Sequence, residues 1–297
     1  MSSTPPHTSP ASTGSPAITT IHPTAIVSKD CEIGEGVRIG PHCVITGRVR
    51  LGRAVVLTGS NYICGEFGPV TIGEATRLWP HASIGFEPQD YKFSGVTAGV
   101  EIGARCMIRE SATVHVSTRA DRATRLGDGV FMMGNTHVAH DCVIGNNVVM
   151  VNGSGFAGHC EVGDNVTMGG NAVAHQNCRI GRFVMMSGDC AINKDVTPFC
   201  IVSERNRIGG LNIVGLRRNG YRDQITGLTR AFKEYLYRPM PKDQVIAGLR
   251  AIAIEDKAPL AAEMADFLNA SVRGFVTGFG KPERGAVRAG RDGGEDE

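Results

Sequence analysis

An aliphatic residue followed by glycine returns every 18 residues through the middle of this chain. The pairs are Leu126-Gly127, Ile144-Gly145, Val162-Gly163 and Ile180-Gly181, and an earlier pair at Ile33-Gly34 repeats at Leu51-Gly52. A chain that returns to one side-chain type after a constant interval forms coils of constant circumference, and eighteen residues divide into three hexapeptides. We therefore predict a hexapeptide β-helix with three short flat faces per coil and the aliphatic side chains inside. The glycine is expected to take a turn conformation that a Cβ would resist.

Two more columns keep the same interval. They are Met132, Met150, Met168 and Met186, and Cys142, Cys160 and Cys178. We expect both columns to point inward, with the cysteines as reduced, buried, small apolar residues. A disulfide framework is not expected, because the chain is too large and too regular to need cross-links. This use of cysteine predicts a reducing, cytoplasmic location.

Three intervals between the aliphatic-glycine positions exceed 18 residues. They run from Leu51 to Ile72, from Ile72 to Ile102 and from Ile102 to Leu126, with surpluses of 3, 12 and 6 residues. We expect the surplus residues to leave the prism as loops, the largest carrying residues 87–93 and the second near 117–122. Loops that interrupt a regular solenoid are the usual place for binding groups.

The period changes after the repeats. Apolar residues then recur at helical spacing in three stripes: Ile225, Leu228, Phe232 and Leu236; Val245, Leu249 and Ile252; Leu260, Met264, Phe267 and Leu268. We predict a β-helix over 21–213, capped by an α-helical domain over 214–280, because the last coil would otherwise expose its core and backbone edge. The Ser/Thr/Pro-rich residues 1–20 and the polar residues 281–297 are expected to be disordered tails, the first not a secretory signal.

Composition excludes some classes of function. The net charge of +2 over 297 residues gives no global basic field for nucleic acid. No window of 18 apolar residues occurs, so no membrane span is expected.

Five of the nine histidines lie at similar positions of their coils: His115, His137, His140, His159 and His175. Because coils of a β-helix stack about 4.8 Å apart, we expect a ladder of imidazoles along one edge. A lone histidine is usually a satisfied surface residue, but several in nearly one phase favour a site. The ladder fits general-base catalysis or a three-histidine zinc site between subunits. A nucleophilic Cys142 beside His140-Asp141 is a third reading, weakened by its place in the inward column.

Several short motifs resemble one acyltransferase family. They are Gln89-Asp90-x-Lys92, Asn135-Thr136-His137-Val138-Ala139-His140-Asp141-Cys142, Ala157-Gly158-His159, His175-Gln176 and Asn212-Ile213-x-Gly215-Leu216-x-Arg218. With the helical cap, the chain resembles the UDP-N-acetylglucosamine 3-O-acyltransferases, which carry out the first step of lipid A synthesis. The resemblance covers roughly residues 22–275. It implies a left-handed parallel β-helix, assembled as a homotrimer with active sites between subunits.

The resemblance also implies roles for individual residues. His140 would be the general base, oriented by Asp141, and the Gly158 N–H would stabilise the oxyanion. Substrate would be held by Gln89, Asp90, Lys92, His137, His159 and Gln176, with Asn212 and Arg218 at the nucleotide. Gly188 matches the position that limits acyl-chain length, with Met186 as another possible stop. No metal, cofactor or covalent intermediate is implied. The partners would be acyl carrier protein and UDP-N-acetylglucosamine.

The sequence departs from the family pattern at several positions. Val214 stands where an acidic residue is common, Asn219 where a second basic residue is common, and Arg207 where a histidine is common. Val116 replaces a frequent arginine. The first three departures bear on nucleotide recognition more than on the chemistry.

Other functions stay open at this point. A related N-acyltransferase would act on a glucosamine amine, although that family usually carries a uridine-binding domain before the prism. A relative acting on a diamino-sugar, a non-catalytic nucleotide-sugar-binding homologue and a zinc carbonic anhydrase are further alternatives. The intact His140-Asp141 pair argues against the non-catalytic reading.

Overall fold

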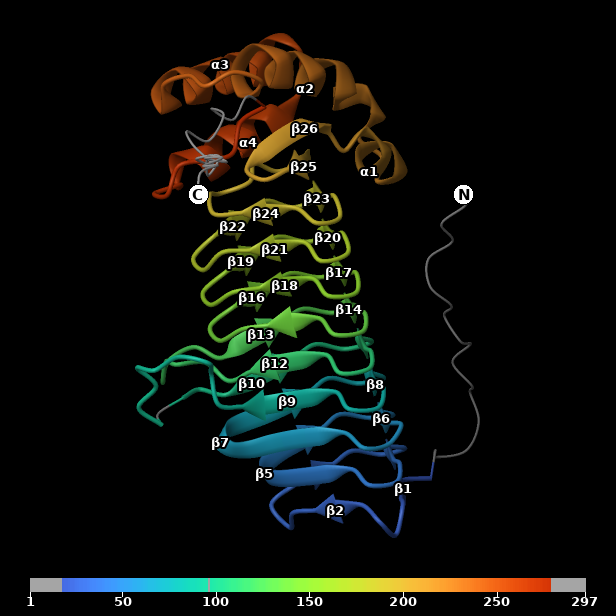
Figure 1. Ribbon diagram of the computed structural model, residues 1–297. Coiled ribbons are helices and arrows are strands. Elements are labelled where there is room, and N and C mark those ends of the chain that lie inside the picture. Colours follow the sequence, from blue (N-terminus) through green and yellow to red (C-terminus); the bar gives the residue numbers. More distant parts are fainter. Residues whose placement is uncertain (1–17, 96, 279–297) are drawn as a thin grey trace, which may run out of the picture.

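The computed structural model describes residues 18–95 and 97–278, and in these the chain forms a three-sided prism of stacked coils (Figure 1). Strands on all three faces pair in parallel with the coils before and after them, so the predicted left-handed parallel β-helix is confirmed. Of the predicted tails, residues 1–17 and 281–297 lie outside the described residues, whereas Thr20, predicted as the end of the first tail, pairs with Arg38 as part of the first strand.

Each face is a stack of short strands. The first face holds β1 (Thr20–Ile21), β4 (Arg38–Ile39), β6 (Val56–Leu57), β8 (Arg77–Leu78), β11 (Met107–Ile108), β14 (Phe131–Met132), β17 (Val149–Met150), β20 (Thr167–Met168), β23 (Met185–Met186) and β25 (Cys200–Glu204). The second face holds β2 (Ile26–Val27), β9 (Ser83–Phe86), β12 (Thr113–His115), β15 (His137–Val138), β18 (Gly155–Phe156), β21 (Val173–Ala174) and β24 (Ala191–Ile192). The third face holds β3 (Glu32–Ile33), β10 (Val100–Ile102), β13 (Thr124–Leu126), β16 (Val143–Ile144), β19 (Glu161–Val162) and β22 (Arg179–Ile180). The longer strands β5 (Val44–Leu51) and β7 (Tyr62–Ile72) run over the second and third faces.

The inward columns are as predicted. Met132, Met150, Met168 and Met186 are fully buried, and so are Cys142, Cys160 and Cys178. A catalytic thiol at Cys142 is therefore excluded, because its side chain lies inside the prism.

The role predicted for the repeated glycine is wrong. Gly127 and Gly145 do not have a positive φ; the left-handed residue comes two positions later, at Gly129 and Asn147. Glycine is needed because a Cβ on Gly127 would lie 2.7 Å from Asn146 Oδ1 and 2.8 Å from the carbonyl carbon of Gly145 in the next coil. The close stacking of coils at the corner, and not the local dihedral angle, selects glycine there.

The prediction for the surplus residues is correct for two intervals and wrong for the third. The surpluses of 12 and 6 residues form a long loop (described over 87–95 and 97–99) and a short loop (116–123), which project from one side of the prism (Figure 1). The surplus of 3 stays inside β7, where the pairing with β5 shifts register between Gly47 and Val49. A bulge therefore absorbs these residues without ending the strand.

The two loops are joined to each other. Ala98 N–H donates to Arg119 O at 2.6 Å, and the hydroxyls of Thr97 and Ser117 lie 3.0 Å apart. Ser117 Oγ also accepts from Ala98 N–H at 3.2 Å. The long loop thus supports the short loop against the prism.

A hairpin and four α-helices cover the C-terminal end of the prism (Figure 1). The elements are β26 (Arg207–Leu211), antiparallel to β25, then α1 (Ile213–Arg218), a 3-10 turn η1 (Arg222–Gln224), α2 (Ile225–Ala231), a π-helical turn η2 (Phe232–Leu236), α3 (Lys242–Glu255) and α4 (Pro259–Asn269). The first apolar stripe predicted as a helix lies on α2 and η2, and the other two lie on α3 and α4, whereas the hairpin and α1 were not predicted. Arg182 joins the cap to the prism through a bidentate pair with Glu263, at 2.6 and 2.7 Å. Within 18–95 and 97–278, no helix has the length and apolar character that crossing a membrane requires.

Candidate active site

His140 and Asp141 form a hydrogen-bonded pair at a corner between the second and third faces. His140 Nδ1 lies 2.8 Å from Asp141 Oδ2, and both residues are buried. Asp141 has a φ of +61°, the left-handed conformation that asparagine and aspartate tolerate best, so the corner turns its carboxylate back toward the neighbouring ring. An Nδ1–H held by the carboxylate leaves Nε2 as the basic atom of a neutral imidazole. Within the described residues, Nε2 makes no hydrogen bond.

The Asp141 carboxylate is held from the opposite side by the short loop. Thr118 N–H donates to both carboxylate oxygens at 3.1 Å, and the Thr118 hydroxyl donates to Oδ2 at 2.7 Å. Burial alone would raise the pKa of Asp141, but the hydrogen bonds from His140 and Thr118 outweigh it and hold the pKa below its ordinary value. The carboxylate is therefore charged at neutral pH and fixes the orientation of His140.

Four of the histidines form two ring pairs in place of the single predicted ladder. The rings of His140 and His159 meet edge to face at 5.0 Å, and those of His115 and His137 at 4.8 Å. His159 Nδ1 also lies 3.7 Å from Asp141 Oδ2, while His175 is exposed. The prediction of one continuous ladder is wrong because these residues occupy neighbouring columns of the coil and not a single one.

The second ring pair is electrostatically neutral at physiological pH. Burial, followed by the charges of His137 and His140, lowers the pKa of His115 to about 4. Burial, followed by the charge of His140, also lowers the pKa of His137. His137 Nδ1 lies 2.7 Å from the Thr113 hydroxyl, whereas His115 Nδ1 is buried without a partner. This side of the site can thus offer uncharged donors and acceptors.

Gly158 lies one coil after His140, directly against the His140 ring. A Cβ at this position would come within 2.5 Å of His140 Cε1 and 2.6 Å of Nε2, so the corner admits only glycine while the ring keeps its place. The Gly158 carbonyl accepts from Asn177 N–H, but the Gly158 N–H donates no hydrogen bond within the described residues. A free backbone donor thus lies beside the basic nitrogen.

The predicted residues of the long loop are not in contact with the histidines. Gln89 and Lys92 are exposed, and Asp90 Oδ1 accepts from Lys92 N–H at 3.0 Å in a local turn. The loop touches the site indirectly, through the short loop that carries Thr118.

The predicted residues farther along the chain have other neighbours. Gln176 lies in the column of His140 and Gly158, and its carbonyl accepts from Arg273 at 2.7 Å. Asn212 caps α1, accepting from Gly215 N–H and donating to Phe183 O, both at 2.9 Å. Arg218 is exposed in the last turn of α1. The structure therefore groups His137, His140, Asp141, Gly158 and His159, and leaves the loop and cap residues outside that group.

Gly188 lies at a different corner of the prism, where the chain passes from β23 on the first face to β24 on the second, and it is exposed. An added Cβ would meet Gly170 O only at 3.4 Å, so a side chain fits. Met186 is fully buried. The expectation that Met186 could stop an acyl chain is wrong, because an inward core side chain cannot reach a ligand outside the prism.

One group of possible metal ligands occurs within residues 18–95 and 97–278. Ligand atoms of His140, Asp141 and His159 lie within 4.8 Å of one another. The Asp141 oxygens already accept from Thr118 and His140, so a metal would have to replace those hydrogen bonds. The group contains two histidines and one aspartate, whereas the zinc alternative requires three histidines. The zinc alternative is therefore disfavoured.

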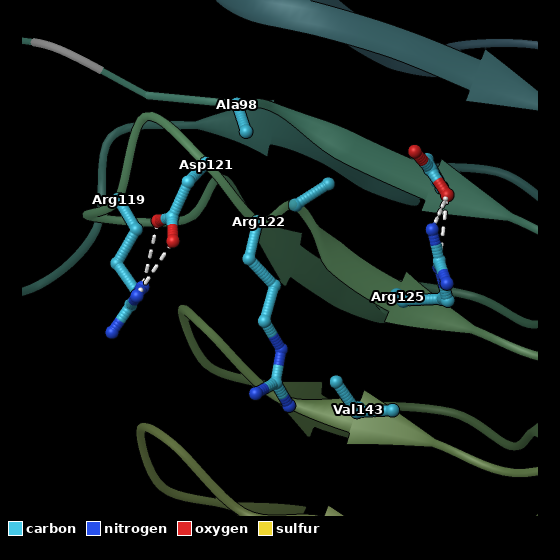
Figure 2. Close-up of a pocket in the computed structure, with 8 residues that line it drawn as sticks. Ala98, Arg119, Asp121, Arg122, Arg125 and Val143 are labelled. Atoms are coloured by element: carbon cyan, nitrogen blue, oxygen red, sulfur yellow. Dashed lines mark hydrogen bonds and ion pairs between the residues drawn. The ribbon is translucent and has the colours of Figure 1, made fainter.

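A depression of about 700 Å³ lies beside the short loop on the third face and contains none of the histidines. Figure 2 shows Arg119, Arg122 and Arg125 in its lining. Each is paired with a carboxylate: Arg119 with Asp121 at 2.7 Å, Arg125 with Glu101 at 2.5 Å and Arg122 with Glu161 at 3.3 Å. Because these charges are already paired with carboxylates, we place the candidate site at the histidines.

Sequence reasoning missed three threonines that organise the site. Thr118 holds Asp141, Thr113 contacts His137, and Thr124 Oγ accepts from Asp141 N–H at 2.8 Å. The only signal for Thr118 was its place in a loop that interrupts the repeat. Thr113 and Thr124 carry no such signal, since threonine is common on strands.

Comparisons with known proteins identify the chains and folds to which this protein is similar. Residues 195–276 match the family model described as UDP N-acetylglucosamine O-acyltransferase, domain 2, and residues 17–47 match the bacterial transferase hexapeptide model. An acyl-[acyl-carrier-protein]–UDP-N-acetylglucosamine O-acyltransferase from Thermodesulfovibrio yellowstonii is 39% identical over 86% of this chain and 98% of its own length. Its counterpart from Mesorhizobium japonicum is 48% identical over 84% of this chain and 89% of its own length. The crystal structure of the Moraxella catarrhalis UDP-N-acetylglucosamine O-acyltransferase has a TM-score of 0.79 at 36% identity, covering 86% of this chain and 99% of its own.

Proposed function

The chain belongs to the UDP-N-acetylglucosamine O-acyltransferase family, and from this premise we propose that it moves an acyl chain from acyl carrier protein to the 3-hydroxyl of UDP-N-acetylglucosamine, the first acylation of lipid A synthesis. The observation that carries the chemistry is the His140–Asp141 pair at 2.8 Å, with Nε2 unpaired beside Gly158. A buried imidazole that is oriented by a carboxylate suits a general base.

The proposed reaction needs only the side chains of this protein and the two substrates. His140 Nε2 takes the proton of the sugar 3-hydroxyl as that oxygen attacks the thioester carbonyl carbon. The C–O bond forms, and the carbonyl oxygen carries a negative charge. The C–S bond then breaks, and the leaving thiolate of the carrier receives the proton from the His140 imidazolium. Asp141 stabilises the imidazolium without taking its proton.

The oxyanion would be stabilised by the Gly158 N–H. Oxyanion donors act at 2.7–3.1 Å from the developing charge, and a donor with no competing acceptor meets that requirement without reorganisation. Glycine also keeps the surface beside His140 clear for the thioester.

Eight residues are proposed to hold the substrates or support the groups that do. They are Gln89, Asp90, Lys92, His137, His159, Gln176, Asn212 and Arg218. His137 and His159 lie beside the His140–Asp141 pair. Both are proposed to contact hydroxyls and the acyl carbonyl, and the uncharged state of His137 suits this role. The loop and cap residues would contact the sugar diphosphate and the nucleotide.

A homotrimer is part of the proposal and is supported by the outer surface of the first face. An outward column there is mostly apolar and in register from β11 to β25: Met107, Phe131, Val149, Thr167, Met185 and Ile201. Met185 is exposed and the other five residues are half-buried. An apolar column of this length on the outer surface suits a protein contact, and a second copy of the chain would cover this one. Light scattering should give three times the chain mass of 31.5 kDa, and an active monomer would contradict a site shared between subunits.

The acyl carrier protein would approach the cap. Arg217 and Arg222 are exposed near the end of α1 and the start of η1, on either side in sequence of Arg218, which is proposed to contact the nucleotide. A local basic cluster attracts an acidic partner even when the whole chain is nearly neutral. The buried free thiols suit a reducing compartment, so the proposed location is the cytoplasm.

One assay tests the reaction and its regiochemistry. The purified protein is incubated with 3-hydroxyacyl carrier proteins and either UDP-N-acetylglucosamine or its 3-amino analogue, and products are identified by mass spectrometry. An ester product with the hydroxyl substrate supports the proposal. Acylation of the amine alone would identify the N-acyltransferase alternative, and binding of the UDP-sugar with no product would identify a non-catalytic homologue.

A further inference from the structure

The thiol of Cys142 is hydrogen-bonded to the next coil directly beneath the candidate active site. Its Sγ lies 3.2 Å from the Ala157 carbonyl oxygen, and the Cys142 side chain is fully buried. Within the described residues, no backbone N–H donates to this carbonyl, so the thiol is the donor that satisfies it. A buried carbonyl without a donor is costly.

The Ala157 carbonyl and the Gly158 N–H belong to one peptide group. No cis peptide bond occurs in the described residues, and in a planar trans peptide the C=O and N–H point in opposite directions. Holding the carbonyl toward the interior of the prism therefore aims the Gly158 N–H outward. Outward at this corner is the side of His140, whose ring lies against Gly158.

We propose that Cys142 is a positioning residue: its thiol fixes the Ala157–Gly158 peptide so that the Gly158 N–H stays aimed at the oxyanion. This inference rests on the proposed function, since it concerns the donor used in that reaction. Cys142 touches neither substrate nor reacting atoms. Gly158 has no side chain to hold its own peptide plane, so an anchor on the neighbouring coil is the means the fold offers.

Cysteine is one of several small residues that the prism accepts directly after a corner. Cys142 directly follows a left-handed corner residue; the same position is Cys160 and Cys178 at this corner of the next two coils, and Val148, Ser154 and Ala172 at other corners. The prism therefore accepts valine, serine or alanine after such a corner. Cys160 makes the equivalent bond to His175 O at 3.2 Å, so Cys142 is distinguished only by the carbonyl it reaches, which shares its peptide group with the Gly158 N–H.

The neighbouring coils provide a matched control. Cys178 lies in the same inward column and is equally buried, but its Sγ is 4.0 Å from Ile192 O and does not bond to the Ala157–Gly158 peptide. Cys178→Val and Cys142→Val thus make the same change in the same kind of core environment. Only the second removes the donor beneath Gly158.

The test compares steady-state kinetics of the wild-type chain, Cys142→Val, Cys142→Ser and Cys178→Val with acyl carrier protein thioester and UDP-N-acetylglucosamine. For Cys142→Val we expect kcat to fall about tenfold, less than the ~10²–10³-fold loss that follows removal of an oxyanion donor. The KM for the UDP-sugar should not change, because the ground-state contacts are elsewhere. Cys142→Ser keeps a hydroxyl donor and should recover most of kcat, and Cys178→Val should retain the wild-type kcat.

Three results would overturn the positioning role: a wild-type kcat in Cys142→Val, an equal loss in Cys178→Val, or a Cys142→Ser variant as slow as Cys142→Val. The second result would mean a general packing effect. The third would mean that the donor is irrelevant. If the wild-type chain forms no product, the proposed function itself fails, and the positioning role falls with it.

Discussion

Thr118 and Asp141 are 23 positions apart in sequence, and the Thr118 hydroxyl donates to Asp141 Oδ2 at 2.7 Å. The same oxygen accepts the bond from His140. The loop that interrupts the repeat is therefore the element that fixes the carboxylate of the dyad. Its position depends in turn on the long loop, because Ala98 and Thr97 bind it.

Replacing Thr118 by valine should lower kcat and change its pH dependence. The hydroxyl lowers the pKa of Asp141, so its loss raises that pKa and moves the acid limb of the rate profile to higher pH. Hydrogen bonds to charged groups contribute about 1.5–3 kcal/mol, so a rate loss of about tenfold or more is expected. The measurement is kcat against pH for Thr118→Val and Thr118→Ser. An identical profile for valine would show that the hydroxyl does not act on the dyad.

Replacing His140 by alanine should lower kcat by ~10²–10⁴-fold, the usual contribution of a general base. The fold should persist, since the ring lies at a corner beneath the short loop and outside the core columns. Circular dichroism and light scattering check the fold. The control is His22→Ala, at an exposed histidine on the first coil, which should keep full activity. Turnover at the wild-type rate by His140→Ala would remove the general base from the mechanism.

Stability should rise with pH between about 4 and 6.5, in part because of His115. Burial lowers its pKa from 6.5 to about 4 in the folded chain. In this window the unfolded chain binds a proton at His115 and the folded chain does not, so the free energy of unfolding increases with pH. Melting temperatures of the wild type and His115→Phe at pH 4.5 to 7 test this. Parallel curves for the two proteins would mean that His115 does not titrate differently on folding.

Introducing a side chain at Gly188 should shorten the preferred acyl donor. The position is open and accepts a Cβ, and overlap with even one methylene in a packed groove costs about 1–3 kcal/mol. For Gly188→Met, kcat/KM should peak at donors several carbons shorter, while the sugar specificity is retained. A series of 3-hydroxyacyl carrier proteins gives the length profile. A profile unchanged from wild type would place the acyl chain elsewhere.

Substitutions at Asn212 and Arg218 should distinguish an effect on stability from an effect on nucleotide binding. Asn212→Ala removes the cap of α1 and the bond to Phe183 O, so stability should fall by about 1 kcal/mol. Arg218→Ala removes an exposed charge and should leave stability unchanged while raising the KM for UDP-N-acetylglucosamine. Denaturant unfolding and steady-state kinetics measure both. If Asn212→Asp, which keeps a cap oxygen, restores stability but not KM, Asn212 also contacts the nucleotide.

The sequence was enough to define the prism. The aliphatic and methionine columns fall inside it because strict 18-residue periodicity leaves one way to bury them all. The His140-Asp141 adjacency was also readable, since neighbouring residues at a corner stay neighbours in any coil of this kind. The helical stripes of the cap followed from their spacing in the same way.

Only the tertiary structure decided what these residues contact. Thr118 reaches Asp141, the Cys142 thiol reaches the Ala157 carbonyl, and the repeated glycines face the backbone of the next coil. The histidines expected as one ladder separated into two pairs. A repeat period fixes which residues share a column, but side-chain direction and loop path depend on contacts between coils. Those contacts join residues that are 15 or more positions apart, and no local pattern encodes them.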